Sequence, residues 1–94
     1  MMEILHKDDG KRGMFYIEAD GKPEGIIEYV WAGSQKLIIE HTEVGEKLKG
    51  QSAGKKLVNS VVEFAREKHV KVQPLCTFAH AVFEKTPEYS DVRF

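Results

Sequence analysis

Apolar and polar residues alternate along the first half of the chain in a way that is typical of strands. Residues 14–19, 25–31 and 36–44 are rich in aromatic and β-branched side chains, and residues 4–6 precede them as a shorter apolar segment. Turn-forming residues, such as those at 20–21, separate these segments. Because connections this short join antiparallel strands, the pattern predicts an antiparallel meander.

The pattern changes to a helical period in the second half of the chain. Apolar residues recur at steps of three and four along residues 52–68, while charged and amide side chains occupy the other side. A short strand-like segment follows at residues 71–76. The strand at 36–44, the helix and this second strand have the lengths of a right-handed crossover, so we expect the two strands to be parallel.

A second, shorter helix is expected near the C-terminus. Thr77 is a good N-cap for a helix that carries Phe78 and Val82, and Pro87 closes it. Together the elements predict an α+β fold with a mixed, mainly antiparallel sheet, a β-α-β crossover and a C-terminal helix. A length of 94 residues leaves room for one hydrophobic core, so we expect residues 1–94 to form a single domain.

Composition and charge narrow the expected partners and location. Lys and Arg number 14 against 15 Asp and Glu, so a net charge of -1 provides no general attraction to nucleic acid or to an anionic membrane. No apolar run approaches the ~20 residues of a membrane-spanning helix. A single cysteine and no N-terminal leader indicate a cytoplasmic protein, and the near-zero charge leaves a monomer as the default expectation.

The strongest local charge asymmetry lies in residues 45–56, where four lysines accompany one acid. The small residues around Gly50 and Gly54 let the backbone approach a ligand, and free N–H groups at a helix start attract anions, so the segment predicts a phosphate site. Neither the P-loop spacing nor G-x-G-x-x-G is present, which disfavours a nucleotide hydrolase or a Rossmann domain. The alternative is a solvated lysine face on a flexible turn.

Four segments of the chain, residues 41–44, 48–58, 72–76 and 86–89, resemble the GNAT superfamily of N-acetyltransferases, and within it a branch of small single-domain members. The pyrophosphate-loop pattern of the family falls on residues 49–54. The chain departs from that pattern in two places. Lys49 stands where Arg or Gln is usual, and Ser52 stands where Gly is usual.

The resemblance implies that acetyl-CoA is the co-substrate and that its acetyl group passes directly to an amine acceptor. The pyrophosphate would lie on the loop amides and the pantetheine arm between two parallel strands. A backbone N–H, which we assign to Val44, would polarise the acetyl carbonyl. The predicted cofactor-binding residues are Thr42, Val44, Lys49, Gly50, Gln51, Ser52, Ala53, Gly54 and Lys55. The scattered histidines form no metal-ligand motif, so no metal is expected.

Three residues are candidates for catalysis. Cys76 lies where a strand ends and a helix begins, a position that favours a reactive thiolate; the alternative is inert packing. Because the family resemblance implies direct transfer without an acyl-enzyme, it implies a proton-handling or substrate-lining role for Cys76 and not a covalent one. His41 is expected on the same strand face as Leu37 and Ile39, where it is either a hydrogen-bonded core residue or the base that deprotonates the amine. Glu43 is the alternative base.

The connection between the first two strands, residues 7–14, is too short for the helices that the family usually places there. Those helices help to wall the acceptor site. We therefore expect an open site that takes a protein or peptide amine, or a partner that completes the pocket. The competing interpretation is a noncatalytic module that binds CoA or another phosphate ligand, or a protein-interaction domain.

Overall fold

The fold of the protein is given by a computed structural model that describes residues 3–94. Its elements confirm the expected α+β class. In chain order they are β1 (Leu5–Asp8), β2 (Arg12–Ala19), β3 (Lys22–Trp31), β4 (Lys36–Val44), the 3-10 helix η1 (Glu46–Leu48), α1 (Ala53–Lys68), β5 (Lys71–Pro74), α2 (Thr77–Glu84) and the 3-10 helix η2 (Pro87–Tyr89).

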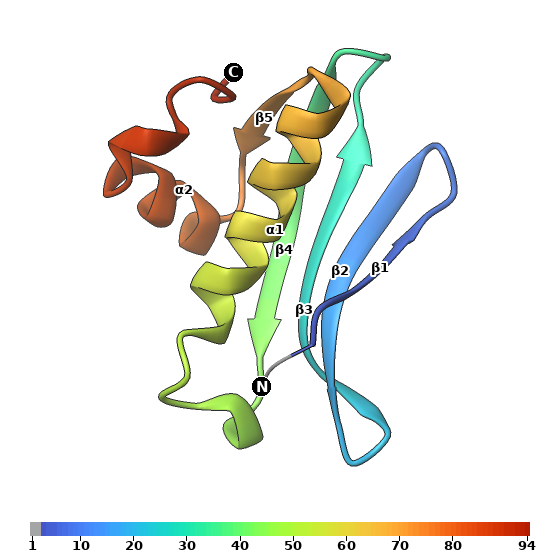
Figure 1. Cartoon of the computed structure of the whole chain (residues 1–94), viewed down its shortest axis with the longest axis vertical. Coiled ribbons are helices and arrows are strands. Elements are labelled where there is room, and N and C mark those ends of the chain that lie inside the picture. The colour runs from blue at the N-terminus through green and yellow to red at the C-terminus, as the bar shows by residue number, and fades with distance from the viewer. Residues whose placement is uncertain (1–2) are drawn as a thin grey trace.

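The five strands form one sheet in the order β1-β2-β3-β4-β5. The first four are antiparallel neighbours, whereas β4 and β5 are parallel and are joined by α1, as the crossover prediction required (Figure 1). The connection between β1 and β2 is a tight turn in which the Asp9 carboxylate accepts hydrogen bonds from the N–H groups of Lys11 and Arg12. This connection contains no helix.

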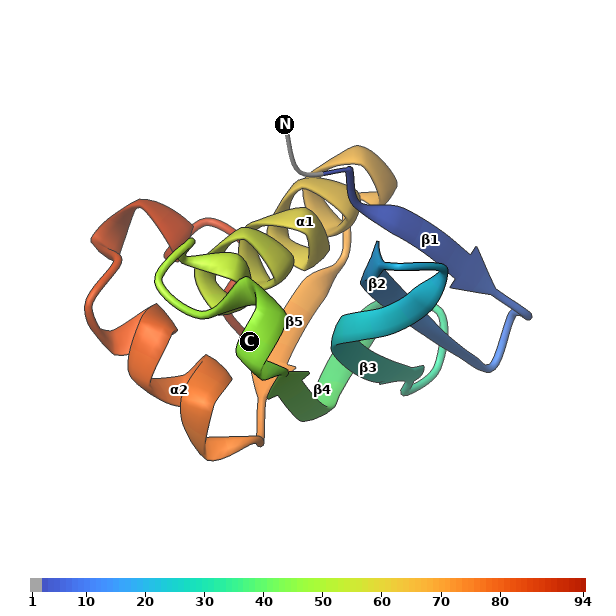
Figure 2. The ribbon, with the colours of Figure 1, turned by 90° about the horizontal axis from the view of Figure 1, so that it is seen from below.

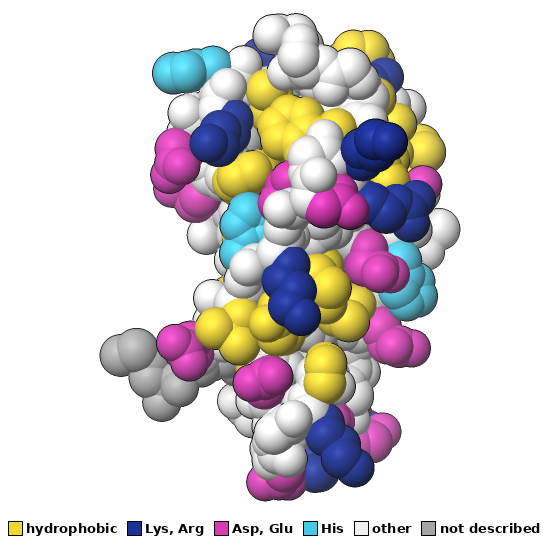
Figure 3. Space-filling view, turned by 90° about the vertical axis from the view of Figure 1, so that its right-hand side faces the viewer, with side chains coloured by type: hydrophobic (Ala, Val, Ile, Leu, Met, Phe, Trp, Pro, Cys, Tyr) yellow, Lys and Arg dark blue, Asp and Glu magenta, His cyan; other side chains and the backbone are white. Residues whose placement is uncertain are grey.

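Helix α1 lies across one face of the sheet, and α2 packs beside β5 (Figure 2). Among the described residues no helix crosses the opposite face. On the β1–β2 side of the molecule, apolar side chains alternate with charged side chains of both signs (Figure 3). No helix in the described part of the chain is long and apolar enough to cross a membrane.

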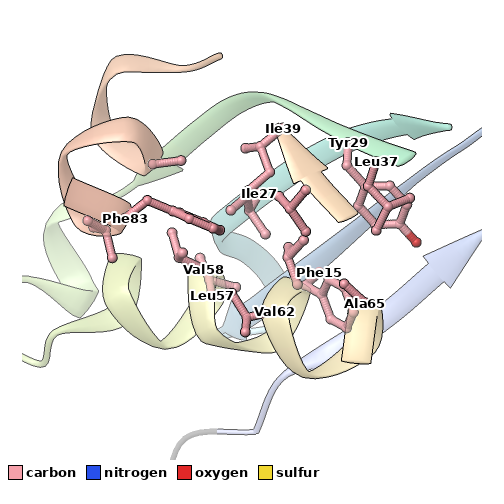
Figure 4. Packing of buried hydrophobic residues seen from close by; sticks show 14 of the residues in the cluster. Phe15, Ile27, Tyr29, Leu37, Ile39, Leu57, Val58, Val62, Ala65 and Phe83 are labelled. Carbon is pink, nitrogen blue, oxygen red and sulfur yellow. The ribbon is translucent and has the colours of Figure 1, made fainter. Parts of the chain in front are cut away.

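The core lies between α1 and the inner face of the sheet (Figure 4). Burying these apolar side chains is the main driving force for folding, at roughly 25 cal/mol per Å² of apolar surface. The fully buried members with the largest side chains are Tyr29, Ile27, Leu37, Ile39, Leu57, Val58, Val61, Val62 and Val72.

The start of α2 corrects one prediction. Thr77 is the first residue of the helix and not its N-cap. The cap is Cys76, whose Sγ accepts a hydrogen bond from the Ala79 N–H at 3.4 Å. The preceding strand is also shorter than expected, because the N–H groups of Leu75 and Cys76 both donate to the Ile39 carbonyl, where the chain leaves β4.

Candidate functional site

A β-bulge in β4 determines which side chains face the groove. Tyr29 pairs with Ile39, but Glu28 pairs with His41, so Glu40 is an extra residue on β4. His41 therefore lies with exposed Glu28 on the outer face of the sheet. The prediction that His41 shares a face with Ile39 is wrong, because the bulge breaks the regular alternation of the strand.

The same bulge turns Thr42 toward α1. Thr42 pairs with Ile27, which is fully buried beneath the helix. Val44 pairs with Gly25, and a Cβ at Gly25 would contact the Leu48 side chain at 3.0 Å on the helix side. Thr42 and Val44 thus lie on the inner face, whereas Glu43, between them, shares the outer face with His41.

Strands β4 and β5 separate just beyond the bulge. Their parallel pairing ends at Ile39 and Pro74. The N–H groups of Leu75 and Cys76 both donate to the Ile39 carbonyl, each at 3.1 Å, so the chain after Pro74 turns away from β4. Among the described residues, no strand pairs with residues 42–44 on the β5 side, and a groove opens there.

Cys76 lies across this opening from Thr42. The Cys76 Sγ and the Thr42 Oγ1 are 3.2 Å apart, and the thiol is half-buried. The N–H of Ala79 also donates to the sulfur, so the cysteine is fixed by both β4 and α2. Sequence reasoning identified Cys76 but did not predict its contact with Thr42.

The loop before α1 presents backbone N–H groups. Gly50 has a φ of 82° and Ser52 a φ of 57°, so both adopt the left-handed conformation that glycine adopts most readily. The N–H groups of Gly50 and Ser52 donate to no other described residue. The first N–H groups of α1, beginning at Ala53, have no partner within the helix. The loop therefore has the amide arrangement that binds anions.

The loop lysines differ in their availability. Lys47 is held by Asp20, with the Lys47 Nζ 2.6 Å from the Asp20 carboxylate. Lys49, Lys55 and Lys56 form no ion pair with other described residues. Lys49 and Lys55 lie beside the free amides, whereas Lys56 lines a different hollow together with Glu18.

These features meet in a groove of about 490 Å³ between β4, the loop and α2. Eight of the nine predicted cofactor-binding residues line it. Gln51 does not; it lines a different hollow, and its side chain donates to the Lys47 carbonyl. The residues that line it are Thr42, Val44, Gly45, Glu46, Leu48, Lys49, Gly50, Ser52, Ala53, Gly54, Lys55 and Phe78.

Phe78 is a groove residue that sequence reasoning missed. Its ring lies against Gly54, so closely that a Cβ at Gly54 would be 2.5 Å from the Phe78 Cζ. The ring is 41% exposed and so borders the groove from the α2 side. The sequence pattern placed it only among the apolar residues of the second helix, and no local motif marks it as part of a site.

The other two catalytic candidates lie apart from the groove. His41 lines a separate hollow of about 380 Å³ on the outer face, together with Glu40 and Arg12. Arg12 and Glu40 form an exposed ion pair at 3.5 Å. The structure thus brings Thr42, Val44 and the loop together. Cys76 contacts Thr42 but does not line the groove, and His41 and Glu43 lie on the other side of the sheet.

Comparison with known proteins decides the family. The sequence model of the GCN5-related N-acetyl-transferase family matches residues 14–92. The chain belongs to the GNAT family. A GCN5-like protein of Staphylococcus aureus, solved by NMR, is 36% identical with a TM-score of 0.75, and the alignment covers 98% of this chain and 87% of that one.

Other similar proteins are more distant. Protein NATD1 of Danio rerio is 26% identical over 80 residues, which is 84% of this chain and 73% of the relative. A GNAT acetyltransferase of Elizabethkingia anophelis, solved with acetyl-CoA bound, shares the fold with a TM-score of 0.68 at 12% identity, covering 92% of this chain and 74% of that one. The chain is thus a small acetyltransferase-family domain, and the family resemblance found in its sequence is confirmed.

Proposed function

We propose that this chain is an acetyl-CoA-dependent N-acetyltransferase that moves an acetyl group directly to an amine of a protein or peptide. The observation that carries the proposal is the groove between the separated ends of β4 and β5, which joins the amide-rich loop to Thr42. Thr42 in turn contacts Cys76. The solved GNAT protein with acetyl-CoA bound supports this choice of co-substrate.

In the proposed complex, the pyrophosphate accepts hydrogen bonds from the amides of residues 49–54. The ammonium groups of Lys49 and Lys55 add electrostatic attraction, since both line the groove without a competing carboxylate partner among the described residues. The pantetheine arm lies along residues 42–44. The Val44 N–H polarises the acetyl carbonyl, and no metal takes part.

The proposed reaction forms one bond and breaks another. The amine nitrogen attacks the acetyl carbon, the C–N bond forms, and the C–S bond to CoA breaks. The nitrogen loses a proton and the CoA thiolate gains one. Cys76 does not line the groove itself but contacts Thr42, which does, and we assign its thiol to this proton transfer and not to a covalent intermediate.

The proposed base has a less direct route to the amine. His41 and Glu43 lie on the outer face, so a proton would reach either of them through water around the edge of β4. If His41 or Glu43 accepts the proton, His41→Ala or Glu43→Gln shifts the pH profile of kcat/KM. An unchanged profile in both variants assigns the proton to solvent instead.

The acceptor is proposed to be large because the site is open. The tight β1–β2 turn leaves no helical wall, and no described helix covers the outer face of the sheet. A free small amine would meet few contacts in such a site, whereas a protein or peptide can supply its own surface.

Mass spectrometry tests the proposal directly. Peptides with a free lysine or a free N-terminus are incubated with acetyl-CoA and the protein, and we expect a gain of one acetyl group together with release of CoA thiol. Lys49→Gln should raise the KM for acetyl-CoA, whereas Lys11→Gln, which removes the same charge outside the groove, should leave it unchanged. Saturable turnover confined to a free polyamine would contradict the proposed acceptor class.

A noncatalytic CoA-binding module is the second candidate. The position of His41 and Glu43 outside the groove favours it, because a binding module needs only the loop. Binding of acetyl-CoA without acetyl transfer to any peptide would support this second function.

A further inference from the structure

A second and larger groove lies between the C-terminal half of α1 and strand β1. Its volume is about 1030 Å³, and it shares no lining residue with the cofactor groove. The residues that define it here are His6, Asp8, Trp31, Glu63, Phe64 and Glu67. The nearest lining residues of the two grooves on α1 are Lys55 and Asn59, four positions apart, so about 6 Å of helix separates the grooves.

One wall of this groove is aromatic. The His6 and Phe15 rings stack with centroids 4.0 Å apart, and Phe64 meets His6 edge-on at 4.7 Å. Trp31 meets Phe64 edge-on at 6.1 Å. Ring faces attract cations, and Lys68 already places its Nζ 5.8 Å from the Phe64 ring centre.

A carboxylate is fixed at the end of the aromatic wall. Asp8 accepts hydrogen bonds from the Tyr29 hydroxyl at 2.5 Å, from the Trp31 Nε1 at 3.0 Å and from the Gly10 N–H at 2.7 Å. Partial burial alone would raise the pKa of Asp8, but these donors outweigh that effect and hold its pKa below the usual value. Asp8 is therefore negatively charged at neutral pH and is held in one orientation.

The groove carries a net negative charge. Asp8, Glu63 and Glu67 line it, against the ammonium of Lys68 and the guanidinium of Arg66, which pairs with Glu63. Burial lowers the pKa of His6, so its imidazole is neutral at physiological pH. Neither Asp8 nor Glu67 forms an ion pair with a lysine, arginine or histidine of the described chain.

We infer that this groove binds a basic peptide segment, with a lysine or arginine side chain laid along the aromatic wall and its charged end toward Asp8. The methylene groups of such a side chain can pack against the aromatic rings, and its positive charge is attracted to the carboxylates. A free metal ion does not suit the site, because the described residues contain no cluster of ligands that could hold one. The inference stands apart from acetyl transfer, because the two grooves share no lining residue.

The chain contains its own reporter for this site. Trp31 is the single tryptophan, it lines the groove, and it does not line the cofactor groove. Its fluorescence and its indole N–H resonance are followed while the whole protein is titrated with a trilysine peptide blocked at both ends. We expect a saturable change in both signals that weakens as salt is added.

Two ligand controls identify what is bound. A blocked triglutamine peptide, which lacks the charge, should leave the Trp31 signals unchanged. Spermidine supplies the same cationic groups without a peptide, and we expect it to bind more weakly than trilysine. If spermidine binds more tightly than trilysine, the ligand is not a peptide. If triglutamine changes the Trp31 signals as much as trilysine does, the groove does not recognise positive charge.

Matched variants test the charge. Glu67→Gln removes an exposed carboxylate that forms no ion pair with a described residue, so the fold should be retained, and we expect the trilysine affinity to fall roughly two- to fivefold. Glu18→Gln removes the same charge from β2 outside the groove and should leave the affinity unchanged. No change at Trp31 with millimolar trilysine, or an equal loss in both variants, would contradict the inference.

Discussion

At the scale of single residues, Cys76 has two structural partners that its place in the sequence did not reveal. Position alone identified it as a thiol at a strand end, but the cap was assigned to Thr77 because hydroxyls are the usual N-caps. The folded chain instead uses the sulfur as the cap and places it against Thr42, 34 residues earlier. A contact this distant in sequence has no local signal.

Substitutions of Cys76 distinguish its structural role as a helix cap from its proposed role in proton transfer. Cys76→Ala removes the acceptor for the Ala79 N–H and should lower the free energy of unfolding by about 1 kcal/mol, whereas Cys76→Ser retains an acceptor and should lower it less. Both changes should reduce kcat roughly tenfold or more, with little change in the KM for acetyl-CoA. Urea unfolding and steady-state kinetics measure the two effects. An unchanged kcat in both variants would remove Cys76 from the mechanism.

His6 makes the stability of the fold depend on pH. Its Nε2 lies 2.7 Å from the Tyr29 hydroxyl, and burial lowers its pKa from 6.5. The unfolded chain therefore binds a proton more readily than the folded chain, so stability is complete above about pH 6.5 and decreases as the pH falls below it.

We expect the melting temperature to decrease between about pH 7 and pH 5, and His6→Gln, which can still bond to Tyr29, should flatten that decrease. Asp8 does not titrate in this window, because its pKa lies below the ordinary value of 3.8. Circular dichroism melting curves over this range test the expectation. An equally steep decrease in His6→Gln would assign the effect to another group.

At the scale of elements, the strands and helices were predicted well but the faces of β4 were not. The range 36–44 agrees with β4, and 52–68 differs from α1 by one residue. The bulge at Glu40 carries no glycine or proline to mark it, so regular alternation placed His41 on the wrong face. Pattern reasoning locates a strand from its composition, whereas an unmarked bulge depends on how the neighbouring strand pairs.

The contact between α1 and α2 leads to a prediction about the groove. Gly54→Ala should raise helix propensity by up to about 1 kcal/mol, yet its Cβ would collide with the Phe78 ring. Because that ring is partly exposed, we expect it to shift into the groove while the fold is retained. Acetyl-CoA affinity measured by calorimetry should fall, and a second change, Phe78→Leu, should restore much of it. Unchanged affinity in Gly54→Ala would show that the ring moves away from the groove.

At the scale of the whole molecule, a net charge of -1 conceals two local fields of opposite sign. The lysine-rich segment 45–56 runs into the start of α1, while Asp8, Glu63 and Glu67 gather beside its other end, where Arg66 pairs with Glu63. The lysines are close in sequence, so the first field was predicted. The acidic groove joins β1 to residues more than fifty positions later, and only the packing of α1 on the sheet brings them together.

The central claim is that acetyl-CoA lies between β4 and β5 with its pyrophosphate on the loop. The most direct test is a residue-resolved NMR titration of the whole protein with acetyl-CoA, using CoA and AMP as controls. We predict amide shifts along residues 42–56 and at Cys76 that are larger with acetyl-CoA than with AMP, while the Trp31 indole resonance stays unchanged. No shifts in these residues at millimolar acetyl-CoA would contradict the claim.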